Sequence, residues 1–186
     1  MRLPGSGAPE PVGYDLGPDP DLGLWLAEWP DYYDRIIHFG PDDGRDPGQL
    51  CWDVLTPSGL LAPHCPQCRH RGGHGGPRSP QQLDTALHVR IPPAEAPAWF
   101  AATLERNLVY TNGWTRSAMT PLAEALGTAL ADLLGPDADW RANGYAAYWE
   151  GSPNRSWQPV TEATFDAALV GIGGGHAVVV VATGED

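Results

Sequence analysis

The chain has 186 residues, which suits one domain, and 42% of them are hydrophobic, enough for a substantial buried core. Its formal net charge of −12 argues against binding to nucleic acid or to an anionic membrane surface. The 3 cysteines argue against a framework of disulfides alone, and no segment is apolar for long enough to form a signal peptide or a membrane span, so we expect a cytoplasmic protein.

The charge also favours one kind of partner. An acidic surface attracts a protein with a basic surface, because complementary fields speed encounter and set specificity. All 11 basic residues are arginine, and with the abundant Ala, Gly and Pro this usage indicates a GC-rich bacterial coding sequence, such as that of an actinobacterium.

The N-terminal part divides into an arm and a helix. Residues 1–18 are rich in Pro and Gly and are predicted to be a flexible arm, followed by a single domain over residues 19–186. Asp19 and Pro20 suit an N-cap and a first helical turn, and apolar residues then recur at helical spacing up to Trp29.

A group of strands is predicted next. Hydrophobic runs predict strands over residues 32–39, 50–55 and 83–91, with residues 60–62 as a short hairpin partner. Residues 64–80 form a long loop inserted between strands, and a loop of this length is usually functional or held by a specific device such as a metal.

The C-terminal half completes an α+β domain. Helices are predicted over residues 94–108 and from Pro121 to Gly135, with Thr120 as the N-cap of the second. Strands are predicted over residues 144–149, 164–172 and 177–183, although residues 161–169 could instead form a helix. We therefore expect a largely antiparallel sheet with two to three helices packed on one face.

The inserted loop carries the densest chemistry of the chain. Two cysteines separated by two residues can direct both thiolates at one zinc ion, and two histidines follow within reach. The predicted zinc ligands are Cys65, Cys68, His70 and His74. Cys51 or His88, from outside the loop, could supply the fourth ligand instead. Free thiols in a solvent-exposed loop are the alternative, whereas the glycine-rich segment after Cys68 argues against a redox-active pair at a helix N-terminus.

A zinc ion here is expected to be structural. No His-Glu-x-x-His helix or deaminase motif is present, and a loop with few apolar residues gains order from a metal. Arg69, Arg71 and Arg78 make one positive spot that could bind a phosphate or carboxylate, and a zinc-knuckle regulator of nucleic acid is a third, weaker hypothesis.

The chain lacks the sequence motifs of a familiar enzyme. There is no phosphate-binding loop and no nucleophile elbow. Asp31, Asp34 and His38 could form an acid/base cluster, although polar surface residues at the start of a strand are the preferred interpretation. A small enzyme with a Trp-lined pocket, and a metal in it, remains the alternative to a binding protein. The tryptophans that could line such a pocket are Trp99, Trp114, Trp140, Trp149 and Trp157.

The C-terminal segment resembles a known group. The tail reads Trp157-Gln158-Pro159-Val160-Thr161, then Thr164-Phe165-Asp166, and ends Gly184-Glu185-Asp186. It resembles the C-terminal hairpins of immunity proteins from bacterial polymorphic-toxin systems, which are acidic α+β proteins. The resemblance implies a non-enzymatic protein that neutralises a cognate protein by binding it, and it assigns no individual residue a role.

Overall fold

The computed structural model describes Leu16 and residues 20–29, 35–61, 76–105, 120–144, 158–163 and 165–184. Within these residues the centre of the fold is a hairpin of β4 (Phe165–Gly173) and β5 (His176–Gly184). Consecutive valines favour the extended backbone of β5. The turn between the strands consists of Gly174 and Gly175, whose φ angles of +56° and +78° lie in the left-handed region that favours glycine.

Three shorter strands extend the hairpin into a sheet. β1 (Arg35–Pro41) pairs with the outer side of β5, and β3 (Asp139–Ala142) pairs with β4. β2 (Val89–Ile91) pairs with β3, which gives the order β1-β5-β4-β3-β2 with every neighbouring pair antiparallel. The predicted α+β class with a largely antiparallel sheet is confirmed.

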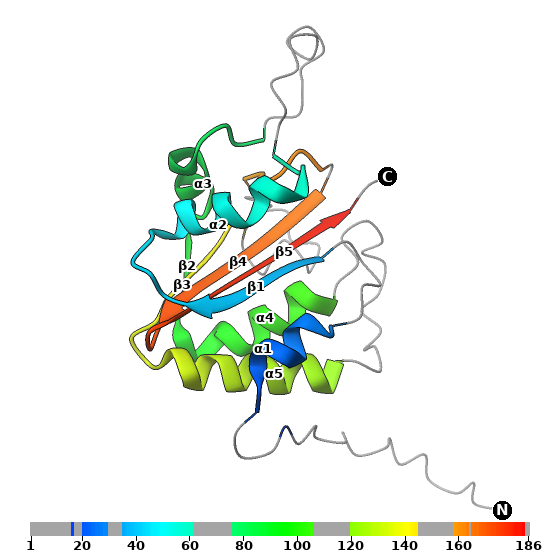
Figure 1. Ribbon diagram of the computed structural model, residues 1–186, viewed down its shortest axis with the longest axis vertical. Helices are drawn as coiled ribbons and strands as arrows, with labels where there is room; N and C mark the ends of the chain where they lie inside the picture. Colours follow the sequence, from blue (N-terminus) through cyan, green and yellow to red (C-terminus); the bar gives the residue numbers. More distant parts are fainter. Residues whose placement is uncertain are drawn as a thin grey trace, which may run out of the picture.

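Helices cover both faces of this sheet (Figure 1). One face carries α1 (Leu22–Ala27), α4 (Ala96–Glu105) and α5 (Thr120–Leu134), which are the expected helices on one face. The opposite face carries α2 (Pro47–Leu55) and α3 (Pro80–Ala86) in addition. Two 3₁₀ turns, η1 (Thr56–Ser58) and η3 (Pro93–Glu95), lie next to α2 and α4.

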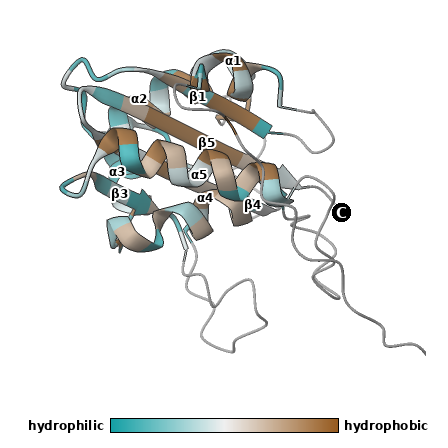
Figure 2. Ribbon diagram, turned by 90° about the horizontal axis from the view of Figure 1, so that it is seen from below, coloured by the Kyte–Doolittle hydropathy of each residue, from teal (hydrophilic) through white to brown (hydrophobic). Residues whose placement is uncertain are grey.

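The sheet therefore separates two hydrophobic cores. The larger lies under α1, α4 and α5 and contains Phe100, Leu126 and Trp140, while the smaller lies under α2 and α3. Because side chains alternate along a strand, Val178 belongs to the larger core and Val179 to the smaller. Figure 2 shows that β5 is hydrophobic, and Figure 1 shows its place between the two helical layers.

Two predicted strands are helical instead. Residues 50–55 belong to α2, which begins where the Asp46 carboxylate accepts a hydrogen bond from the Gln49 N–H at 2.7 Å. Residues 83–86 belong to α3, which Ser79 caps in the same way, and only residues 89–91 form a strand. Each helix starts at an N-cap residue followed directly by proline. This pair is a stronger indication of a helix than a short apolar run is of a strand.

The remaining boundaries differ by a few residues. The first helix begins at Leu22 with Asp21 as its N-cap, and Leu60 and Leu61 lie outside any strand. Thr120 is the first residue of α5, and β4 is a strand over the stretch for which a helix was the alternative. The predicted strand over residues 144–149 lies outside the described residues except for residue 144, and the predicted arm over residues 1–18 does so except for Leu16.

Candidate partner-binding surface

The predicted zinc ligands, which lie outside the described residues, are Cys65, Cys68, His70 and His74. Arg69 and Arg71 of the same loop also lie outside the described residues. The described base of the loop lies against residues 160–162. The Glu162 N–H donates a hydrogen bond to the Leu60 carbonyl at 3.0 Å, and a Cβ on Gly76 would lie 2.9 Å from the Thr161 carbonyl oxygen. Both ends of the loop are thus held at one place.

The two alternative ligands differ in accessibility. Cys51 is fully buried in the smaller core, and burial, reinforced by the negative charge of Asp166, raises the pKa of its thiol to about 12. His88 is exposed, and its Nδ1 lies 2.8 Å from the Ala86 carbonyl oxygen, to which its N–H donates. The described residues contain no group of three or more His, Cys, Asp or Glu placed to hold a metal.

A buried carboxylate holds the segment on which the loop rests. Asp166, on β4, is 1% exposed. One of its oxygens accepts hydrogen bonds from the Val160 N–H, the Thr161 N–H and the Thr161 hydroxyl at 2.7–2.9 Å. The other accepts from the side-chain amide of Asn143 at 2.8 Å. This saturated carboxylate anchors residues 160–161 to the sheet, and through them the base of the Cys/His loop.

The Asn143 side-chain amide, which donates to Asp166, makes further hydrogen bonds. The Asn143 side chain also donates to the Gln158 carbonyl at 2.9 Å, and its oxygen accepts from the Ala168 N–H at 2.8 Å. Every hydrogen bond of this network joins two backbone segments, and the side chains of Asn143, Thr161 and Asp166 are at most 2% exposed. The arrangement suits anchoring rather than acid–base catalysis, which needs contact with a substrate.

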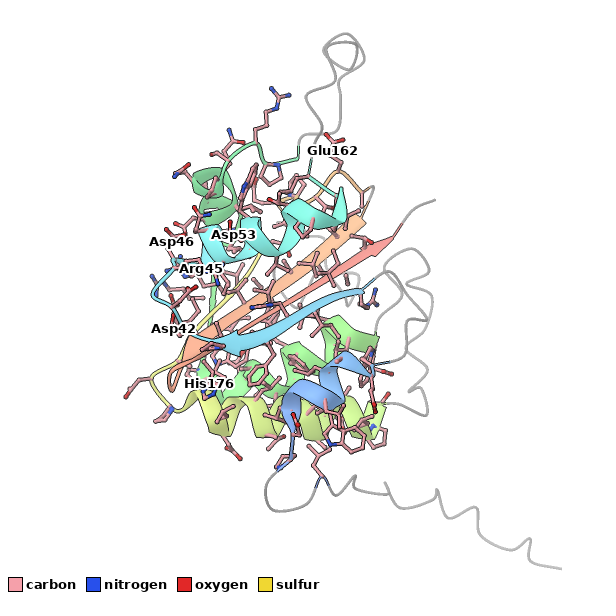
Figure 3. The ribbon with its side chains drawn as sticks, viewed as in Figure 1. Asp42, Arg45, Asp46, Asp53, Glu162 and His176 are labelled. Atoms are coloured by element: carbon pink, nitrogen blue, oxygen red, sulfur yellow. The ribbon has the colours of Figure 1, made fainter. Side chains whose placement is uncertain are left out.

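Carboxylates gather at one end of the sheet, which we call the acidic end. There β1 finishes, α2 begins, α5 runs into β3 and the β4–β5 turn lies between them. The Asp42 N–H donates to the Gly175 carbonyl at 2.9 Å, which ties the end of β1 to this turn. The acidic end comprises Asp42, Asp43, Asp46, Asp53, Asp84, Asp132, Asp137 and Asp139. Figure 3 shows Asp42, Asp46 and Asp53 with Arg45 on one side of the molecule.

Close backbone approach brings α5 to the acidic end. A Cβ on Gly173 would lie 2.4 Å from the Leu134 carbonyl oxygen, and one on Gly174 would lie 2.2 Å from that of Leu133. Only glycine permits such contact between the turn and the C-terminus of α5. The sequence could not indicate that Asp42 and Asp132, 90 positions apart in number, share one end of the fold.

The arginines at the acidic end are already paired with carboxylates. Arg45 contacts Asp43 at 2.7 Å and Asp53 at 2.9 Å. The hydrogen bond from Arg45 holds the pKa of the Asp43 carboxyl below its usual range. These contacts are exposed, so their contribution to stability is small.

A second arginine lies on β3. Arg141 bridges Asp139 at 2.9 Å and Asp84 at 3.1 Å, and the hydrogen bond to Asp139 raises the guanidinium pKa. Arg90 contacts Asp139 at 3.3 Å. No ion pair engages Asp42, Asp46 or Asp137 within the described part of the chain, so the acidic end keeps a negative excess that a basic partner could neutralise.

Other predicted candidates are dispersed. His38 lies on β1, but Asp31 and Asp34, its expected neighbours, are outside the described residues. Arg78 is exposed one residue before the cap of α3, and its backbone N–H donates to the Gln82 side chain at 2.7 Å. Among the described residues these groups do not form a common site.

Of the tryptophans predicted to line a pocket, the structure describes Trp99 and Trp140. Trp140 is 1% exposed in the larger core, and Trp99 packs against the same core. Trp140 borders a shallow cleft of about 410 Å³ together with Arg90 and Asp137. Its indole N–H has no hydrogen-bond partner among the described residues, and it is buried away from the cleft's water. Trp114, Trp149 and Trp157 lie outside the described residues.

Comparisons with known proteins give no match: no family model, no curated protein and no solved structure is similar to this chain. Among the described residues, no helix combines the length and apolar character needed to span a bilayer. The acidic end is therefore the feature of the described structure from which a function can be proposed.

Proposed function

We propose that this protein is a non-enzymatic binding protein whose acidic end contacts a protein partner with a basic surface. The observation that carries the proposal is the charge arrangement: aspartates from several elements converge while the neighbouring arginines Arg45 and Arg141 are already paired. Such a surface steers a basic partner and rejects acidic ones. The resemblance of the tail to immunity proteins supports a partner that is neutralised by binding.

We also propose a structural zinc ion in the Cys/His loop, held by Cys65 and Cys68 with His70 and His74. The support is the spacing of the two cysteines and two histidines in the sequence, in a loop whose base is held at residues 160–162. In this proposal the ion orders the loop and takes no part in a reaction.

The test of the binding function begins with affinity capture from cells of the source organism, followed by calorimetry with the purified partner. We expect the affinity of this protein for the partner to fall at least about fivefold between 50 and 200 mM salt, because screening weakens interactions between exposed charges. An affinity that does not change with salt would overturn the electrostatic account.

Paired charge-neutralising variants make the test specific to the acidic end. Asp42→Asn with Asp137→Asn removes two exposed negative charges there and is expected to weaken binding and reduce its salt dependence. Glu28→Gln with Glu162→Gln removes the same charge elsewhere; Glu162 lies well away from Asp42 in Figure 3. Equal effects of the two pairs would show that net charge, rather than the acidic end, drives association.

A further inference from the structure

A groove lies beside the acidic end, between α1, β1, the start of β5 and the C-terminal part of α5. Its volume is about 650 Å³, within the range of ligand pockets. Apolar side chains form much of the groove, including those of Leu22 and Ala129. Leu133 also lines the groove, and 38% of its surface is exposed. Burial of an exposed leucine by another molecule is favourable, so an exposed leucine in a concave surface indicates a binding site.

An aromatic platform forms part of the groove. The rings of Phe39 and His176 are stacked, with centroids 5.6 Å apart and planes within 2° of parallel. The His176 Nδ1 lies 3.0 Å from the Gly174 carbonyl oxygen, and its N–H donates to that oxygen, which fixes the ring in this plane. In such a stack, a ring face that is turned away from the other ring is a flat surface of the kind on which a guanidinium stacks.

Carboxylates stand at the edge of the same groove. Asp21 and Asp132 both line it, are exposed, and form no ion pair within the ranges that the structure describes. The position of a Cβ on Gly23 would be 3.4 Å from an Asp21 oxygen and 3.9 Å from the Phe39 ring, so the carboxylate lies next to the platform. The Asp21 carboxylate also accepts a hydrogen bond from the Leu24 N–H at 3.0 Å, as the N-cap of α1. An apolar floor, a flat aromatic face and carboxylates that no described cation neutralises together match one side chain, arginine, whose aliphatic stem, planar head and charge use all three.

We propose that this groove seats an arginine side chain of the basic partner, stacked on Phe39 and His176 with its N–H groups toward Asp21 and Asp132. The proposal rests on the proposed function, because the arginine belongs to the partner that the acidic end attracts. It adds a defined anchor to a long-range attraction, and a buried arginine is a common source of binding energy at protein interfaces.

The experiment uses the full-length, ¹⁵N-labelled protein and follows backbone amide shifts by NMR during titration with N-acetyl-arginine amide. Saturable shifts are expected at residues that line the groove, such as Gly23, Ala129 and His176. N-acetyl-citrulline amide, which has nearly the same shape but no charge, is expected to bind at least about tenfold more weakly. Equal binding of the two compounds, or shifts confined to residues outside the groove, would overturn the proposal.

A variant that fills the groove gives an independent test. Gly23→Met adds a side chain beside Asp21 and Phe39, and because methionine is the better helix former it should not weaken α1. It is expected to abolish the shifts, while Ala27→Met, at an exposed position of the same helix outside the groove, leaves them unchanged. Asp132→Asn should weaken binding about two- to fivefold, the effect of one exposed ion pair. Full binding by Gly23→Met would overturn the proposal.

The same variants separate this proposal from the function on which it rests. If Gly23→Met leaves the salt-dependent affinity for the purified partner unchanged, the acidic end still binds the partner but the groove does not hold its arginine. If the affinity does not depend on salt, the proposed function is overturned, whatever the arginine derivative does.

Discussion

Replacement of Asp166 by alanine is expected to be among the most damaging single changes in the described structure. The substitution removes the only described acceptor of the Val160 and Thr161 N–H groups and one acceptor of the Asn143 amide. Each buried donor left without a partner costs about 1–3 kcal/mol, and relief from burying a charge offsets part of the sum. We expect the free energy of unfolding to fall by about 4 kcal/mol, a large share of the roughly 5–15 kcal/mol typical of a domain.

The measurement is urea denaturation followed by circular dichroism at neutral pH. Asp166→Asn should cost about half as much, because an amide oxygen can replace the carboxylate oxygen that accepts from residues 160 and 161. Asp137→Ala, at an exposed position, serves as the control and should change stability by less than about 0.5 kcal/mol. Amide hydrogen exchange adds a local readout, since Val160 and Thr161 should lose protection first. A loss below about 1 kcal/mol for Asp166→Ala would refute the anchoring argument.

Three further predictions concern the turn, the buried thiol and the metal loop. Gly174→Ala should lower the free energy of unfolding by more than about 2 kcal/mol, since its Cβ would lie 2.2 Å from a carbonyl oxygen of α5. The control is Gly175→Ala, whose Cβ would meet no atom within 4 Å and which should cost only about 1 kcal/mol. Similar losses for the two variants in urea denaturation would contradict the contact with α5. The pKa of Cys51 is raised from 9.0 to about 12, so the stability from its neutral thiol is complete below pH 9 and is lost as the pH rises toward 12. At pH 10 the free energy of unfolding of the wild type should be about 1.4 kcal/mol lower than at neutral pH, whereas a Cys51→Ala variant should not show this loss. Parallel profiles of unfolding free energy against pH for the two proteins would count against this. If zinc is structural, Cys65→Ser with Cys68→Ser should lower the melting temperature by more than about 5 °C, as should a chelator, and an unchanged melting curve would dismiss the metal.

β5 could be predicted because its apolar run is long and rich in valine, whereas β4, with one valine, left a helix open over residues 161–169. The run of residues 50–55 was too short to distinguish a strand from a buried helix, and the decisive signal was the Asp46-Pro47 pair before it. The close packing of α2 on α3 also could not be predicted. A Cβ on Gly48 would lie 2.5 Å from the Pro80 carbonyl oxygen, and this contact depends on how the two helices cross.

The functional residues divide in the same way. Charge composition indicated a basic partner, but the acidic end is assembled by topology from loops that are distant in the chain. Asp166 carried a usable signal, since a single carboxylate within an otherwise apolar strand must be hydrogen-bonded when it is buried. The Cys/His loop remains a prediction from its spacing, since the structure describes only its base.

The two-sided burial of β5 has a consequence for how the β4–β5 hairpin finds its alignment. A strand with valines on both faces would bury similar side chains after slipping by one residue, so its hydrophobic pattern does not specify the alignment. Glycines do so instead: the Trp140 ring occupies the space where a Cβ on Gly171 would lie, at 2.5 Å, and α5 closes on Gly173 and Gly174. A slipped hairpin would present side chains at these points. The alignment is thus chosen by β3 and α5, and a peptide of residues 165–184 alone should populate several pairings and associate through its uncovered valines.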